Sequence, residues 1–84
     1  MKQNIALVKR LRNRFNTDCN YVRILIAVYE QNPRPARKRY IKALVFNMAY
    51  DLTVQISPED KRSQRWLLQY ILGQYSRTLN LGSL

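Results

Sequence analysis

The side chains of this chain that could do chemistry are mostly cations. Of its 84 residues, fifteen are lysine or arginine and five are aspartate or glutamate, and histidine is absent, so the formal net charge is +10. With one cysteine and no histidine, zinc sites built from those residues and Ser-His or Cys-His catalytic pairs are excluded. General acid–base catalysis would depend on five carboxylates or a tyrosine, and two glycines form no glycine-rich phosphate loop. We therefore expect a protein that is not an enzyme and uses no metal, cofactor or small-molecule substrate.

The positive charge is concentrated in the first half of the chain. Residues 1–42 carry eleven cations and two acids, whereas residues 43–84 carry four cations and three acids. Self-repulsion of this size works against a compact fold unless a polyanion relieves it. If the two densest runs share a face, together they could neutralise roughly six to eight phosphates. The first run is Lys9, Arg10, Arg12 and Arg14, and the second is Arg34, Arg37, Lys38, Arg39 and Lys42.

The second run is the stronger signal for an anionic partner. Its cations fall in the first turns of a helix predicted to begin at Pro35, where they oppose the positive end of the helix dipole. The same helix end offers unpaired backbone N–H groups to an anion. Tyr40 lies inside this run and could stack on a base or pack beside Ile41. The candidate nucleic-acid-binding residues are Lys9, Arg10, Arg12, Arg14, Arg34, Arg37, Lys38, Arg39, Tyr40 and Lys42.

The elements that must position these residues are helices. Prolines separate stretches whose apolar residues recur at helical spacing, which predicts one all-α domain over residues 1–84. We expect a compact bundle of about four helices, at residues 2–15, 18–31, 35–54 and 58–78. Asn16, Thr17 and Asp18 are N-cap candidates between the first two, and Ser57 is the predicted N-cap of the last, with Pro58 at its first position.

Several other side chains receive structural assignments. The apolar stripe of the third helix comprises Ile41, Leu44, Val45, Met48, Ala49 and Leu52. Residues 79–84 should fray. Cys19 is expected to be a buried thiol, and Arg62 and Arg65 are expected to be solvated, to pair with nearby acids, or to extend the basic patch. Expected to lie in the core or at its edge are Tyr29, Tyr50, Trp66, Tyr70 and Tyr75.

These observations predict a nucleic-acid-binding module that contacts the sugar-phosphate backbone with little sequence specificity. Arginine outnumbers lysine ten to five, which suits bidentate phosphate contacts. In size, charge and helicity, the chain is similar to the small basic subunits that line the nucleic-acid path of CRISPR effector complexes. This architectural analogy implies a non-catalytic subunit of a larger nucleoprotein complex, with other protein subunits as partners.

Two alternatives remain open. Residues 18–31, the turn at 32–35 and the helix from Pro35 could form a helix-turn-helix of a sequence-specific DNA-binding regulator. Alternatively, the chain could be an adaptor or inhibitor that docks on an acidic protein surface. An excess of exposed apolar side chains on the helices at 18–31 and 58–78 would favour this third function.

The expected location is inside the cell, in the cytoplasm or associated with the nucleoid or nucleus. The longest apolar run, residues 24–29, is far shorter than the roughly 20 residues that span a bilayer, so no membrane partner is expected. The N-terminus has no secretory signal, and one cysteine cannot form an internal disulfide.

Overall fold

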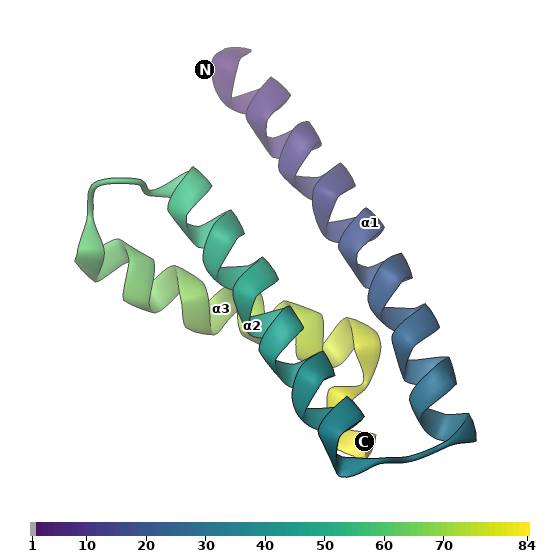
Figure 1. The fold of residues 1–84 in the computed structure, drawn as a ribbon. Coiled ribbons are helices and arrows are strands. Elements are labelled where there is room, and N and C mark those ends of the chain that lie inside the picture. Colours follow the sequence, from purple (N-terminus) through teal and green to yellow (C-terminus); the bar gives the residue numbers. More distant parts are fainter. Residues whose placement is uncertain (1) are drawn as a thin grey trace.

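The computed structural model describes the backbone of residues 2–84 and the side chains of residues 5–84. Within that part the chain is all-helical and has no strand, which confirms the predicted fold class. Helix α1 spans Lys2–Gln31, α2 spans Pro35–Ile56 and α3 spans Lys61–Leu79, and a short 3-10 helix, η1, follows at Leu81–Ser83 (Figure 1). The described chain therefore packs three long helices compactly, and the prediction of about four is wrong by one.

The difference lies in α1, which joins the two helices predicted at residues 2–15 and 18–31. Asn16, Thr17 and Asp18 lie inside it and do not cap a second helix. In a helix interior each of these residue types costs at most about 0.7 kcal/mol relative to alanine, and neither glycine nor proline interrupts residues 2–31. Burial of Cys19 and Val22 directly after this point stabilises the helix through the polar stretch.

Helix α1 sets the length of the molecule. Its thirty residues span about 45 Å at 1.5 Å per residue, close to the longest extent of the fold, which is 46 Å. Helix α2 runs back beside it, and α3 crosses α2 at an angle (Figure 1). The first turns of α1 extend past the end of α2.

The core lies where the three helices meet. The stripe predicted on α2 is confirmed, because Ile41, Val45, Ala49 and Leu52 are buried and Leu44 and Met48 pack at their margin. Helix α1 adds Cys19 and Val22, and α3 adds Ile71, Tyr75 and Leu79.

Two buried polar groups hold α1 to its neighbours in the core. Burial raises the pKa of the Cys19 thiol, as expected for an inert buried cysteine. The fully buried Tyr75 packs on Phe15 with ring centroids 4.5 Å apart and donates a hydrogen bond from its hydroxyl to Asp18 Oδ2 at 3.1 Å. Burial, followed by the neighbouring Asp18 carboxylate, raises the pKa of Tyr75 well above its ordinary value.

Asp60, and not Ser57, caps α3. The Asp60 carboxylate accepts hydrogen bonds from the backbone N–H of Arg62 and Ser63 and from the Ser63 hydroxyl. These bonds, led by that from the Ser63 hydroxyl, hold the pKa of Asp60 below its ordinary value. Ser57 instead ends α2, since its N–H donates to the Thr53 carbonyl at 2.9 Å. The predicted helix start at Ser57 and Pro58 is therefore wrong by three residues.

The last residues of the chain are ordered against the core, contrary to the expected fraying. Asn80 ends α3 in the left-handed conformation, with φ 54° and ψ 46°, which asparagine tolerates better than most residues. This turn directs the chain into η1 and places Leu81 and Leu84 against the core beside the buried Leu79.

Candidate nucleic-acid interface

The two basic runs lie at opposite ends of the α1–α2 hairpin. Arg14 of the first run contacts Asp51, near the C-terminal end of α2. Tyr40 of the second run lines a small groove with Leu25 and Val28, near the C-terminal end of α1. From Arg14 to the end of α1 the helix rises about 25 Å, and from Pro35 to Lys42 the antiparallel α2 returns about 10 Å. The nearest members of the two runs are therefore about 15 Å apart along the hairpin, roughly twice the Debye length of about 8 Å at physiological salt. The structure therefore does not bring the two runs into one continuous patch.

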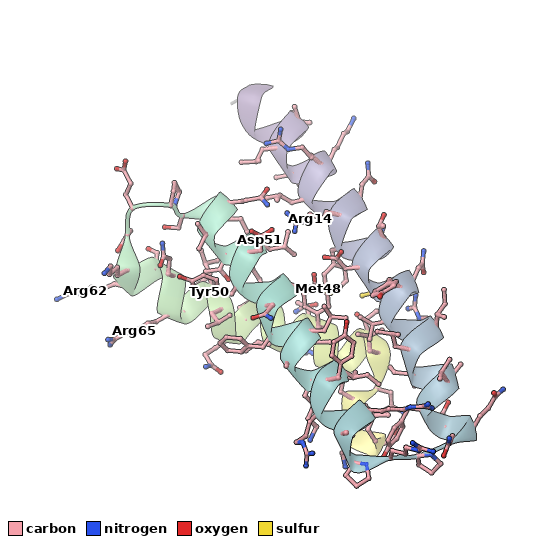
Figure 2. All side chains as sticks on the ribbon, viewed as in Figure 1. Arg14, Met48, Tyr50, Asp51, Arg62 and Arg65 are labelled. Carbon is pink, nitrogen blue, oxygen red and sulfur yellow. The ribbon has the colours of Figure 1, made fainter. Side chains whose placement is uncertain are left out.

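Within the first run, Arg14 differs from its neighbours. Its guanidinium pairs with Asp51 across the α1–α2 interface and lies 4.0 Å from Asp18, one turn along α1 (Figure 2). Lys9, Arg10 and Arg12 are exposed and make no salt bridge to any described acid. We therefore assign Arg14 to helix packing and leave the other three cations available to a ligand.

The second run surrounds the start of α2. Arg34, Arg39 and Lys42 are exposed, whereas Arg37 and Lys38 are half-buried. In the described part of the chain, none of these five cations forms a salt bridge and the N-cap residue, Arg34, makes no side-chain capping bond. The first turn of α2 contains no acid. This helix start is thus a concentration of uncompensated positive charge.

The loop before α2 supports this arrangement. Arg34 has extended backbone, as expected for a residue before proline. The Arg37 guanidinium donates to the Asn32 carbonyl at 3.5 Å, which ties it to the loop. Tyr40 is 56% exposed, so its ring is accessible even though one edge meets Ile41 in the groove.

Two aromatic residues that sequence reasoning did not assign to the site continue from this run. Phe46 and Tyr50 are 46% and 50% exposed, so the expectation that Tyr50 lies in the core is wrong. Their helical spacing places them with Arg39 on the outward face of α2, opposite the buried stripe. We call the set of exposed residues on this side of α2 and α3 the aromatic–basic track. It comprises Arg39, Lys42, Phe46, Tyr50, Lys61 and Arg65.

Helix α3 completes the far end of the track. Tyr50 lines a groove of about 280 Å³ with Lys61, Gln64, Arg65 and Leu68. Figure 2 shows Tyr50 beside the start of α3, from which Arg62 and Arg65 project. The Gln64 side chain donates to the Ser57 carbonyl at 2.7 Å and fixes the α2–α3 loop next to this groove. An exposed ring beside two cations offers stacking for a base and charge for its phosphates.

Other exposed apolar side chains lie away from the track. Trp66 is 66% exposed and stacks on Tyr70 with centroids 5.6 Å apart, so the expected core positions of both are wrong. On α1, the exposed apolar residues Tyr21, Ile24 and Val28 lie on the outer side of its second half. The described chain leaves these surfaces uncovered.

No protein-family model matches this chain, and no curated protein or solved structure is significantly similar to it. Among the described residues, no group of three or more cysteine, aspartate or glutamate side chains could hold a metal ion. Likewise, none of the helices described is both long and apolar enough to cross a membrane.

Proposed function

We propose that this protein is a nucleic-acid-binding module that contacts the sugar-phosphate backbone with little sequence specificity, as a non-catalytic subunit of a larger nucleoprotein complex. One observation carries the proposal. In the described chain the cations at the start of α2 form no salt bridge, and the exposed rings of Phe46 and Tyr50 follow them along α2 to a groove that Tyr50 shares with Lys61 and Arg65. Such alternation of cations and aromatic side chains is typical of proteins that follow a strand.

The residues divide into two roles. Arginine and lysine side chains bind phosphate oxygens. The backbone at the start of α2 adds little, because Pro35 has no N–H and the N–H of Arg37 donates to the Arg34 carbonyl at 3.0 Å. Phe46 and Tyr50 stack on bases, which is tolerant of sequence because every base has a flat face. Stacking needs unpaired bases, so the track favours a single strand over a duplex. From Arg39 to Tyr50 the track is about 16 Å long, enough for several nucleotides.

The helix-turn-helix alternative has less support. Its base-reading residues would be Arg37, Lys38 and Arg39. Of these, Arg39 is exposed, whereas Arg37 and Lys38 are half-buried and the Arg37 guanidinium donates to the Asn32 carbonyl. The helix that would enter the major groove is 22 residues long and begins with a proline, and the loop before it contains Pro33 and no glycine. These features suit a fixed corner of a bundle better than an exposed recognition helix.

Fluorescence anisotropy with random single- and double-stranded DNA and RNA at several salt concentrations tests the proposal. We expect single strands to bind more tightly than duplexes. With about five phosphates neutralised, the logarithm of affinity should fall with the logarithm of salt at a slope of about −3.5. An absence of binding to any of the four nucleic acids at low salt would overturn the proposed function.

A second candidate function is docking on an acidic protein partner. The exposed apolar residues on the second half of α1 and on α3 are the pattern that favours it, namely Tyr21, Ile24, Val28, Trp66 and Tyr70. Burial of such surface is the usual reason for a folded domain to have it. Light scattering coupled to gel filtration is the first test, since a self-associating chain would cover these surfaces without any partner.

A further inference from the structure

A groove lies between α1 and α3, away from the aromatic–basic track. We call it the α1–α3 groove. It has a volume of about 510 Å³, and α1 supplies one wall, α3 the other and the end of α2 the floor. Its lining residues include Val8 and Phe15 of α1, Ile56 of α2 and Tyr70 of α3. A second groove, lined by Ile5, Val8, Lys9 and Arg12, continues it along the first turns of α1.

The walls of the α1–α3 groove are apolar and uncovered in the described chain. Ile5 and Val8 are 59% and 50% exposed, and Tyr70 is 53% exposed. Ile5, Val8 and Phe15 share one face of α1 by helical spacing. The apolar stripe of α1 that packs in the core therefore continues toward the N-terminus, beyond the part of α1 that the other helices cover. Trp66 stacks on Tyr70 and extends the α3 wall by one turn. Exposed aromatic residues in a cleft are the usual anchors of an interface.

The charges around the groove indicate what could cover it. Among its described lining residues, the charged ones are Lys9 and Arg12, and no acid is present. A second copy of this chain would bring another +10 of charge, which opposes self-association. An acidic partner is attracted by the same charge.

We propose that the α1–α3 groove binds an amphipathic helix of a partner protein, with apolar residues on one face and acidic residues at its flanks. The bound helix would lie against α1 and α3 as the fourth helix of the bundle, as amphipathic helices do in other apolar grooves. Its acids would face Lys9 and Arg12, and its apolar face would cover Val8, Ile56 and Tyr70. This inference gives the second candidate function a specific site and does not depend on nucleic-acid binding.

A designed peptide tests the groove directly. The probe is a 20-residue helix without tryptophan, with leucine at positions i, i+3, i+4 and i+7 of each repeat and glutamate on the remaining faces. Trp66 is the single tryptophan of the chain and stacks on Tyr70 of the groove wall, so its emission reports on the edge of the groove at α3. We expect saturable binding with a blue shift of Trp66 emission, and no binding of a scrambled peptide of equal composition.

Neutral variants locate the binding. Val8→Ser and Tyr70→Ala remove exposed groove side chains without changing charge, and each should weaken peptide binding at least tenfold with unchanged circular dichroism. Ile24→Ser is the matched control, since Ile24 is 63% exposed on another face of α1 and should leave the affinity unchanged.

The remaining outcomes would overturn the inference in distinguishable ways. Peptide binding that survives both groove variants but is lost in Ile24→Ser would keep the protein-binding function and reject this groove. An absence of binding to any variant would reject both. A dimer in sedimentation equilibrium that Val8→Ser dissociates would mean that a second copy of this chain occupies the groove.

Discussion

At the scale of single residues, side chains of the same type differ in what their surroundings leave them free to do. Arg14 and Arg12 are two positions apart, yet Arg14 pairs with two carboxylates while Arg12 lines an open groove. The sequence displays both as members of one basic run. The contact with Asp51 distinguishes Arg14 from Arg12. Asp51 is 37 positions away from Arg14 in the chain, so no local sequence pattern predicts this contact.

Arg14→Ala should therefore affect nucleic-acid binding little. We expect less than a threefold loss of affinity and an unchanged salt slope, because this charge is already neutralised. Stability should fall by at most about 1 kcal/mol, since the pair with Asp51 is solvent-exposed on both sides. Salt-dependent anisotropy and urea denaturation measure the two effects. A slope reduced by about one would show that Arg14 contacts a phosphate.

Tyr50 is the residue at which stacking can be tested alone. Stacking on one base is worth about 1–3 kcal/mol, so Tyr50→Ala should lower single-strand affinity about 5- to 150-fold. The salt slope and the duplex affinity should stay the same because no charge is removed. Tyr21→Ala is the control, as Tyr21 is equally exposed but lies off the track. Equal losses in the two variants would contradict a specific role for Tyr50.

At the scale of helices, apolar periodicity and prolines predicted the end of α1 and the start of α2, whereas the boundaries inferred from polar residues, at residues 16–18 and at Ser57, are wrong. The apolar stripe of α2 could be predicted because every fourth or third residue is apolar from Ile41 to Leu52. The same spacing places Phe46 and Tyr50 off that stripe, a signal that could have identified the track. By contrast, α1 continues through residues 16–18 because Cys19 is buried and the Tyr75 hydroxyl donates to Asp18. Both interactions involve residues far away in the sequence, so the local pattern did not predict them.

The start of α3 offers a test at this scale. Asp60→Ala should lower the urea midpoint at pH 7 because it removes the cap, whereas Ser57→Ala should leave it unchanged. Hydrogen bonds lower the pKa of Asp60 in the folded state, so its stabilisation is present above the unfolded value of about 4. It is lost as the pH falls through the folded value. The gap between Asp60→Ala and the native chain should thus narrow in acid.

A Ser57→Ala variant that loses as much stability as Asp60→Ala would place the helix start at Ser57. If the difference in stability between Asp60→Ala and the native chain stays constant down to pH 2, the negative charge of Asp60 does not stabilise the helix start. Asp60→Asn, which keeps an acceptor at the cap, should retain most of the stability at pH 7.

At the scale of the whole molecule, the arrangement of charge follows from the antiparallel turn between α1 and α2. Two runs that are close in sequence lie toward opposite ends of the hairpin, because one precedes the core along α1 and the other begins α2 at the opposite end. The existence of both runs could be read from the sequence, since each is contiguous. Their separation could not be predicted, because residues 2–31 were expected to form two helices. Two separate helices could have packed so that both runs shared one face.

We expect position, and not net charge alone, to direct nucleic-acid binding to the start of α2. Two triple variants separate these causes, because each lowers the net charge of +10 by six. One changes Arg37, Lys38 and Arg39 to glutamate, and the other changes Lys9, Arg10 and Arg12. Glutamate also suits the first turn of α2, so the fold should persist in circular dichroism.

Single-strand affinity of the two variants, measured by anisotropy at equal salt, is the decisive comparison. We predict a loss of more than a hundredfold for the variant at the start of α2 and less than tenfold for the variant on α1. Equal losses would mean that net charge alone drives binding, and retained binding by the α2 variant with an intact fold would contradict the claim.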